Sequence, residues 1–202
     1  MTGADEIPER QVRAQFTERT ITVYQAYPPQ IAEPALAAGT FVPPFKLDRM
    51  TWIKPSFLWM MYRSGWATKA GQERVLAVTV TRDGFEWALA HSCLSHYQPG
   101  IYTSEQQWAD RKLVSPVRVQ WDPERTLTLE PLHHRAIQIG LAEDAARRYL
   151  DEWIVGLTDV TDLAHQVRHL VTTNRLDEAT DKLPGEWPYP LPSELQATIG
   201  TA

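Results

Sequence analysis

The chain has 202 residues, 43% of them hydrophobic and 22% charged, with a formal net charge of −5. These proportions are typical of a globular protein, and the length predicts a single domain over residues 1–202. No apolar run is long enough to span a bilayer, and the polar segment 1–10 differs from a secretory signal. A single cysteine, Cys93, excludes an internal disulfide and a metal site built from clustered cysteines. We therefore expect a cytoplasmic protein that has no membrane partner.

The charges are distributed unevenly along the chain. Residues 10–82 contain ten Lys or Arg and four Asp or Glu, whereas residues 83–202 contain ten and eighteen. One interpretation is chance clustering on solvated faces, and the other is that the first third of the chain approaches phosphates. The overall acidity argues against a protein that coats duplex nucleic acid without specificity, because such a protein would be basic throughout.

The first elements can be predicted from local patterns. β-branched and aromatic residues alternate over 21–27, which predicts a strand that a pair of prolines ends. A short helix follows, and Gly39 is suited to its C-cap. The expected elements of this part are a disordered start (1–9), a short helix or arm (10–19), a strand (21–27), a helix (30–38) and an extended segment (41–45).

Residues 49–66 hold three of the eight tryptophans and three cations. Pro55 lacks an N–H and keeps Lys54 extended, so no helix can run through the whole stretch. The sequence predicts a strand or loop before Pro55 and a helix that begins at Ser56.

The remainder of the chain mixes strands and helices without regular alternation, which favours an α+β fold over a doubly wound sheet. The expected strands are 74–80, 117–121, 126–132 and 135–141, with Pro123 ending the second of them. The expected helices are 84–94, 105–113, 143–155 and 160–171. Residues 183–202 are expected to form a proline-rich tail packed on the domain, irregular over 183–192.

Motifs of several common chemistries are missing from the sequence. His165 and His169 lie four residues apart on a predicted helix, but residue 166 is Gln, so the acidic partner of a zinc-protease motif is absent. We expect solvated or capping histidines and no metal. Cys93 lies among apolar residues of another predicted helix and should be a buried, inert thiol. No phosphate loop or dinucleotide-binding glycine pattern occurs, which argues against kinase, P-loop and Rossmann chemistry.

Carboxylates remain as candidates for catalysis. Asp122 and Glu124 follow a predicted strand, and strand ends are common sites for catalytic groups because the scaffold is rigid there. Either side chain could orient a sugar hydroxyl or stabilise a developing cation. The alternative is an ordinary turn that Asp122 and Pro123 initiate.

The aromatic and basic residues of 49–66 allow two interpretations. Their rings could stack on a base, and Arg49, Lys54 and Arg63 could hold phosphate oxygens. An aromatic stripe on one face of a helix is more often part of a core, and we expect this for Trp59 and Tyr62. We expect a functional role for the groups beside the Pro55 break, which are Arg49, Lys54 and Ser56.

Three segments resemble the family known as domain of unknown function 4291. They are residues 49–66, 117–125 and 135–141. The strand at 24–27 and the start of the tail at 183–184 fit the same family. The resemblance covers nearly the whole chain.

The order of the elements is also similar to that of the ADP-ribosyltransferase fold, in which a split, mostly antiparallel sheet with flanking helices surrounds a cleft for NAD. In that fold an early strand gives an Arg or His, a middle strand gives a Ser or Tyr, and a late strand gives a Glu. The matching positions in this chain are Gln25, Ser56 and the segment 120–124.

The second resemblance implies an enzyme that uses NAD as a substrate to modify an acceptor, with a nucleic acid as one candidate acceptor. A carboxylate near the ribose would stabilise the positive charge that develops when the nicotinamide–ribose bond breaks. The implied catalytic residues are Gln120, Asp122 and Glu124. The implied NAD-binding residues are Gln25, Tyr27, Arg49, Trp52, Lys54, Ser56 and Arg63.

Two other classes of protein remain open from the sequence. A noncatalytic nucleotide- or RNA-binding module would use the same cations and aromatic rings but would need no carboxylate. A scaffold protein would use the aromatic stretch as its core or as an oligomer interface. The three classes differ in whether Arg49, Ser56 and a late-strand carboxylate converge on one cleft.

Overall fold

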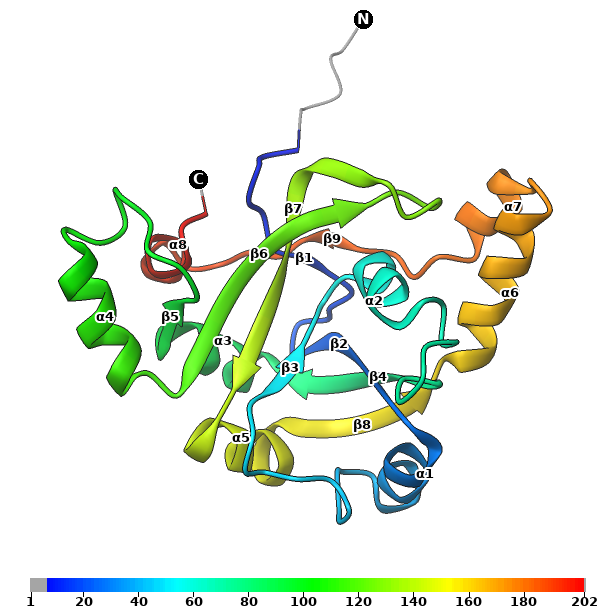
Figure 1. Ribbon diagram of the computed structural model, residues 1–202, viewed down its shortest axis with the longest axis horizontal. Coiled ribbons are helices and arrows are strands. Elements are labelled where there is room, and N and C mark those ends of the chain that lie inside the picture. Colours follow the sequence, from blue (N-terminus) through cyan, green and yellow to red (C-terminus); the bar gives the residue numbers. More distant parts are fainter. Residues whose placement is uncertain (1–6, 202) are drawn as a thin grey trace, which may run out of the picture.

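The strands form two larger sheets that meet at a single bridge, as the computed structural model shows for residues 7–201 (Figure 1). One sheet has the order β2 (Thr20–Tyr27), β4 (Arg74–Thr81) and β8 (Ile154–Asp159), with antiparallel neighbours. The other has the order β3 (Thr51–Ile53), β7 (Pro131–Leu141), β6 (Val117–Arg125) and β5 (Ser92–Leu94), and only its β5–β6 pair is parallel. The expected α+β class with a mostly antiparallel sheet is therefore confirmed.

The bridge between the two sheets joins Tyr24 of β2 to Lys54. The Tyr24 amide donates to the Lys54 carbonyl at 2.7 Å, and the Lys54 amide donates back at 3.3 Å. Pro55 follows at once and cannot donate to a ladder, so the pairing stops there. The sheets therefore diverge from this point, and their separation opens a space between them.

Helices cover the outside of the two sheets and stand at both ends of the molecule (Figure 1). They are α1 (Pro29–Ala38), α2 (Phe57–Ser64), α3 (Arg82–Ala90), α4 (Glu105–Val114), α5 (Glu143–Arg148), the π-helical turn η1 (Tyr149–Trp153), α6 (Thr161–Thr172), α7 (Leu176–Asp181) and α8 (Ser193–Ile199). A short pair, β1 (Arg13–Ala14) and β9 (Trp187–Pro188), ties the tail to the start of the chain. Within residues 7–201, no helix has both the length and the apolar character that a membrane crossing requires.

The helix that follows Pro55 forms for the local reasons that the sequence indicates. The Ser56 side chain accepts a hydrogen bond from the Trp59 amide at 3.0 Å, which satisfies one free donor of the first turn. Gly65 ends the helix in the left-handed conformation, with φ of 58°. Gly39 ends α1 in the same way, with φ of 75°, so its predicted role as the C-cap is confirmed.

Two hydrophobic clusters fill the faces of the β2–β4–β8 sheet. Alternate residues of β2 point to opposite faces, so Val23 lies in one cluster and Tyr24 in the other. The larger cluster joins the two sheets through side chains such as Leu76 and Ile139. The smaller cluster packs α2 and α6 on the opposite face, with Phe57 against Tyr24 at 5.5 Å between ring centroids. Fully burying one such side chain stabilises the fold by about 1.5–3 kcal/mol.

The strand boundaries differ from the expectation at two places in the β6–β7 hairpin. Pro123 does not end its strand, because β6 continues to Arg125 through a register shift that accommodates the proline. The strand expected over 126–132 is mostly the hairpin turn, in which the Leu129 amide donates to the Thr126 carbonyl at 2.9 Å. Both predictions were wrong, because the irregular pairing at Pro123 lets β6 continue to Arg125 and moves the turn to the residues that follow.

Two predicted helices extended too far: the helix expected over 84–94 included β5 (Ser92–Leu94), and the helix expected over 143–155 included the first residues of β8. Helix α3 ends at Ala90, and the segment 92–94 is the edge strand β5. The helical run after Glu143 ends at Trp153, and β8 follows it at once. In both segments apolar residues continue across the boundary, so their pattern alone does not show where the helix stops. Residues 43–45 form a turn rather than an extended segment, with the Phe45 amide bonded to the Val42 carbonyl.

The two ends of the described chain are held by specific contacts. Residues 1–6 of the segment expected to be disordered lie outside the described residues, whereas the Glu9 carbonyl accepts from the Arg135 amide at 2.7 Å. The tail is irregular over most of 183–192, as expected, and then forms α8, which was not predicted. The Trp121 indole donates to the Ile199 carbonyl at 2.8 Å, which fixes α8 on β6.

Candidate functional site

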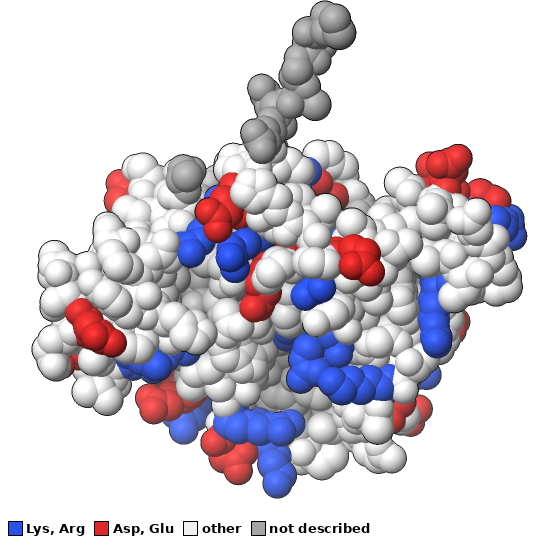
Figure 2. All heavy atoms as spheres, turned by 45° about the horizontal axis from the view of Figure 1, so that its top comes forward, with Lys and Arg blue, Asp and Glu red and all other residues white. Residues whose placement is uncertain are grey.

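A cleft of about 610 Å³ opens where the two sheets diverge. Its walls come from β2, β3, α1, α2 and the loop between α1 and β3, and glutamines of β6 and β7 close one side. Cavities of several hundred cubic ångströms commonly hold small-molecule ligands. Figure 2 shows basic side chains on both sides of a hollow near the middle of one face of the molecule.

The lining of this cleft is basic, aromatic and amide-rich. Its cations are Lys46, Arg49, Lys54 and Arg63, its aromatic residues are Tyr27, Phe45 and Trp52, and its amides are Gln25, Gln72, Gln120 and Gln138. No Asp or Glu of residues 7–201 is among the side chains that line it. Such a surface favours an anionic ligand that carries flat rings.

Lys54 lies at the floor of the cleft and is 7% exposed. Its Nζ donates to the Trp52 carbonyl at 3.1 Å and lies 5.5 Å from the centre of the Trp59 ring. Burial, together with the positive charge of Arg63, lowers the pKa of Lys54 to about 7, and Asp122 opposes this shift. The amine is therefore partly neutral at physiological pH.

Gln25 is buried at the back of the cleft, and its amide forms three hydrogen bonds to other side chains of the protein. Its Nε2 donates to the Tyr27 hydroxyl and to Thr51 Oγ1, each at 2.8 Å. Its Oε1 accepts from the Tyr149 hydroxyl at 2.6 Å. Burial raises the pKa of Tyr27 to about 12, so its hydroxyl keeps its proton. Gln25 therefore fixes the position of the Tyr27 ring rather than offering a free amide to a ligand.

Asp122 lies beside the cleft and orients two of its amides. The Gln120 and Gln138 side chains share one face of the sheet, because these residues are paired in the β6–β7 register. Gln120 Nε2 donates to Asp122 Oδ1 at 2.9 Å, and Gln138 Nε2 donates to Oδ2 at 2.5 Å. Each amide nitrogen uses one of its two N–H donors on Asp122, so the second N–H and the carbonyl oxygen of each glutamine remain for a ligand.

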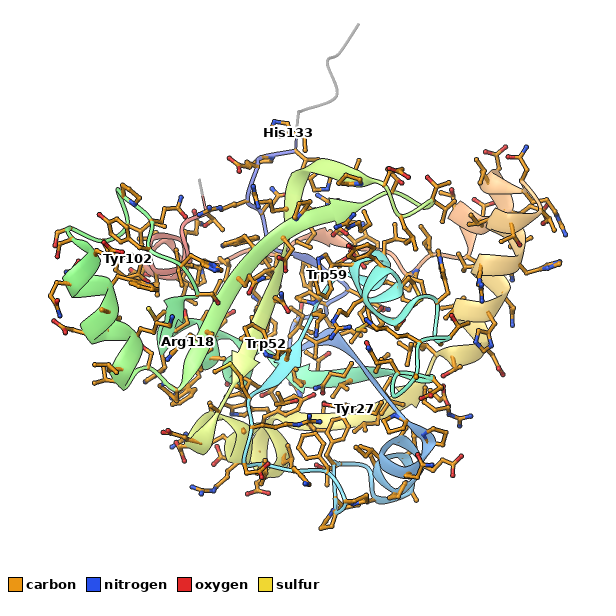
Figure 3. All side chains as sticks on the ribbon, in the orientation of Figure 1. Tyr27, Trp52, Trp59, Tyr102, Arg118 and His133 are labelled. Atoms are coloured by element: carbon orange, nitrogen blue, oxygen red, sulfur yellow. The ribbon has the colours of Figure 1, made fainter. Side chains whose placement is uncertain are left out.

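Trp52 forms a wall of the cleft because Gly140 lies opposite it in the β3–β7 pair. A Cβ atom on Gly140 would lie 2.4 Å from Met50 Sδ and 3.0 Å from Trp52 Cε2. The missing side chain thus lets both residues lie close against β7. In Figure 3, Trp52 lies beside β3 and Tyr27 lies between β3 and α1.

Ser56 and Glu124 line a separate cavity of about 240 Å³, together with Arg13, His134 and Glu186. Ser56 is turned away from the first cleft because its hydroxyl caps α2. Glu186 Oε1 accepts from the Phe57 amide at 2.7 Å, yet burial raises the pKa of Glu186 to about 8. Burial likewise raises the pKa of Glu124. This second cavity holds the partly buried carboxylates that the first cleft lacks.

The structure therefore divides the residues expected from the sequence. The first cleft brings together Gln25, Tyr27, Arg49, Trp52, Lys54, Arg63 and Gln120. Asp122 contacts this group through Gln120, whereas Ser56 and Glu124 face the second cavity. Arg49 thus lines the first cleft without Ser56, and Asp122 is connected to this cleft only through its hydrogen bonds to Gln120 and Gln138.

Sequence reasoning missed several residues of the cleft. Gln138 is a polar residue between Ile137 and Ile139 in an otherwise apolar part of β7. A polar residue in such a segment could have been predicted to have a functional role. Phe45 and Lys46 reach the cleft from the loop after α1, which carries no local signal. Gln72 comes from the turn between α2 and β4.

The core expectations for α2 were partly wrong. Trp59 is buried, as expected, but Tyr62 is 45% exposed, and the Arg125 guanidinium lies 3.5 Å from its ring centroid. Cys93 is buried, although on strand β5 rather than on a helix. His165 and His169 are exposed on α6. Residues 7–201 contain no group of three or more His, Cys, Asp or Glu side chains arranged to hold a metal ion.

Fold and site together define an α+β protein with a basic cleft at the split between two sheets. The chain matches the domain of unknown function family DUF4291 over residues 11–189, and it belongs to this family. Neither the curated proteins nor the solved structures contain a significant match to the chain. The similarity to the ADP-ribosyltransferase fold therefore rests on the order of the elements alone and stays a prediction.

Proposed function

We propose that the cleft binds NAD and that the protein is an ADP-ribosyltransferase-like enzyme, which transfers ADP-ribose from NAD to an acceptor. The observation that carries this proposal is the lining of the cleft, which has four cations, three aromatic residues and, among residues 7–201, no carboxylate. A pyrophosphate flanked by two nucleosides matches this combination of charge and flat surface.

The cations and rings have separate roles in this proposal. Arg49 and Arg63 are both exposed at the cleft. Arg63 donates to Gln72 Oε1 at 3.5 Å and would exchange this contact for the pyrophosphate. The Trp52 ring offers a stacking surface for a base or for the nicotinamide, and such stacking contributes about 1–3 kcal/mol per base. Tyr27 is held in place by Gln25 and offers a second ring.

The reaction breaks the bond between the nicotinamide nitrogen and C1′ of the ribose. Nicotinamide leaves with the bonding electrons, positive charge develops on the ribose, and an acceptor oxygen or nitrogen then bonds to C1′ as it loses a proton. We assign the stabilising negative charge to Asp122, because it is bonded to two amides of the cleft. Gln120 lines the cleft and connects it to Asp122. Glu124 has no role in this step, because it lines the other cavity.

The proposed acceptor is a nucleic acid, and the proposed location is the cytoplasm. Support for the acceptor comes from the excess of cations in residues 10–82, which supply most of the cleft. Single-stranded nucleic acid suits a cleft with exposed arginines and aromatic surfaces better than a duplex does.

A second candidate function is a noncatalytic nucleotide- or RNA-binding module. It is favoured by the amides that stand where a catalytic carboxylate would be expected to line the cleft. Such a module binds the ligand through the same cations and rings and leaves it unchanged.

The release of nicotinamide distinguishes the two functions. NAD is incubated with the protein alone, with single-stranded RNA and with single-stranded DNA, and nicotinamide is measured by chromatography. We expect release by the wild-type protein, a loss of about 10²–10³-fold in Asp122→Asn, and no change in Glu124→Gln. NAD binding without release would support the noncatalytic module. Equal rates for Asp122→Asn and the wild type would remove Asp122 from the mechanism.

A further inference from the structure

Lys54 is a buried amine without an acidic partner. It is 7% exposed, and within the described chain its amine donates one hydrogen bond, to the Trp52 carbonyl at 3.1 Å. No carboxylate of the described residues forms an ion pair with it, because Asp122 is bonded to Gln120 and Gln138 instead. A charged ammonium group at this position is neither well solvated nor paired, and both conditions favour the neutral amine.

The position of Lys54 is fixed by the backbone rather than by a flexible loop. Its peptide groups form the bridge to Tyr24, and Pro55 follows it. Its Nζ lies over the ring of Trp59, 5.5 Å from the ring centroid. The amine is therefore held at the floor of the cleft, where a bound ligand would meet it.

The remaining cations of the cleft stand where they could bind the phosphate of such a ligand. Lys46, Arg49 and Arg63 are all exposed, in contrast to Lys54. One cleft thus combines a buried amine with exposed charges suited to an anion. The buried amine of Lys54 is thus the candidate reactive group, and the exposed cations are the candidates for holding the ligand.

We propose that Lys54 is a nucleophilic lysine and that the cleft takes phosphorylated aldehydes, which form an imine with its amine. The Nζ lone pair attacks the carbonyl carbon, so a carbon–nitrogen bond forms. The carbonyl oxygen leaves as water with the two amine protons, and a carbon–nitrogen double bond remains. The step needs no oxidant or reductant.

The proposal stands whether or not the protein turns over NAD. If the proposed function holds and water takes the place of the acceptor, ADP-ribose is released, and it belongs to the same class of ligand. Its ribose opens to an aldehyde at C1′, and its pyrophosphate carries the charge that the arginines would hold. Lys54 would then capture this product at the site where it forms.

The pKa of about 7 gives the expected size of the effect. At pH 7 about half of the Lys54 amines are neutral, whereas an ordinary lysine is neutral in fewer than about one molecule in a thousand. The lower basicity reduces the intrinsic nucleophilicity of the amine, so we expect an advantage of about tenfold to a hundredfold in the rate of imine formation.

Reductive labelling tests the proposal on the full chain. The protein is treated with pyridoxal 5′-phosphate and cyanoborohydride at pH 7, and the labelled peptides are quantified by mass spectrometry. The chain has five lysines, so each site is readily resolved. We expect Lys54 to be labelled about tenfold or more faster than Lys46, Lys69, Lys112 or Lys182. Equal labelling of all five would overturn the proposal.

Two comparisons test the phosphate requirement. Pyridoxal, which lacks the phosphate, should label Lys54 about tenfold more slowly than pyridoxal 5′-phosphate, and Arg49→Ala with Arg63→Ala should remove this difference. Equal rates with the two aldehydes in the wild type would overturn the phosphate part of the proposal. ADP-ribose with cyanoborohydride should add its mass at the same residue, and its absence there would exclude ADP-ribose from the ligand class.

The same experiment is separable from the test of NAD turnover. Asp122→Asn should lose nicotinamide release and keep Lys54 labelling. If the wild-type protein releases nicotinamide but shows no selective labelling of Lys54, this inference is refuted and the proposed function is not. Lys54→Arg should show no label at position 54, and its thermal unfolding verifies that the variant is folded.

Discussion

Replacing Lys54 with methionine should stabilise the protein in a pH-dependent way. The side chain is buried, and burial with the nearby Arg63 lowers its pKa from 10.5 to about 7. Methionine has a similar length and carries no charge to desolvate. The substitution therefore removes an unfavourable charge from the floor of the cleft.

The magnitude follows from the size of the pKa change. One pKa unit corresponds to about 1.4 kcal/mol, so lowering the pKa from 10.5 to about 7 corresponds to about 5 kcal/mol. Between pH 7 and 10.5 the unfolded chain binds a proton at Lys54 that the folded protein does not bind, so the wild-type stability rises with pH. Below pH 7 both states bind this proton, and the full cost is present. The advantage of Lys54→Met is thus largest at pH 6 and disappears near pH 10.5.

Urea unfolding of both proteins at pH 6, 7, 8, 9 and 10 provides the measurement. The difference in free energy of unfolding between Lys54→Met and the wild type should decrease by about 4 kcal/mol from pH 6 to pH 10. Other titrating groups are common to both proteins and cancel in the difference. Lys46→Met is the matched control, because Lys46 lines the same cleft but is exposed, and its difference should stay constant. A constant difference for Lys54→Met would refute the assignment of a buried, unpaired amine.

Three further substitutions test the Glu186 carboxyl, the packing around Gly84 and the position of Trp52. Between pH 4.5 and 8 the folded protein keeps a proton at Glu186 that the unfolded chain releases, so the wild-type protein loses stability as the pH rises. Glu186→Gln should reduce this loss by about 1–3 kcal/mol. Gly84→Ala should cost about 1–3 kcal/mol in urea unfolding, since a Cβ atom would lie 2.3 Å from the Trp153 ring. Gly140→Ala should displace Trp52 and weaken nucleotide binding about tenfold, as measured by calorimetry.

Each of these results has a contrary outcome. An unchanged pH slope in Glu186→Gln would mean that this carboxyl titrates as in the unfolded chain. Gly156→Ala is the control for Gly84→Ala, because a Cβ atom there would meet only Thr79, at 3.9 Å. Equal costs for these two substitutions would contradict the steric argument. If Gly140→Ala binds the nucleotide with full affinity, Trp52 does not contribute to binding.

The part of the site around Pro55 could be predicted because its determinants are local. A proline, a serine cap and a terminal glycine define where α2 begins and ends, and each acts within a few residues. The same reasoning failed for the face of the helix. Trp59 and Tyr62 were both expected in the core, but Tyr62 is exposed, and the buried positions are Phe57, Trp59, Met60, Met61 and Ser64. Which face a helix buries depends on the sheet it packs against.

The separation of Glu124 from the cleft could not be predicted from alternation. Residues 120, 122 and 124 would share one face of a regular strand. The register shift between Pro123 and Arg125 interrupts this pattern, so Asp122 stays with the Gln120 amide and Glu124 faces another cavity. A proline in a strand indicates an irregularity, but the direction in which the chain turns there depends on the partner strand.

The cleft itself is a long-range feature. Gln138 joins Gln120 through the pairing of two strands, and Lys46 arrives from a loop that no motif marks. Strand β8 was missed because an apolar run continues from the π-helical turn into the strand. Without β8 and the bridge at Lys54, the sequence does not show that two sheets diverge beside the basic residues.

Calorimetric titration of NAD tests the central claim that the cleft binds a phosphate-bearing dinucleotide. We expect binding to the wild type and a loss of about 10–100-fold or more in affinity in Arg49→Ala with Arg63→Ala, because two charge-assisted contacts are removed. The matched control is Arg147→Ala with Arg168→Ala, two exposed arginines that do not line the cleft, and it should bind NAD as the wild type does. No heat of binding with the wild type, or equal losses in the two double variants, would contradict the account.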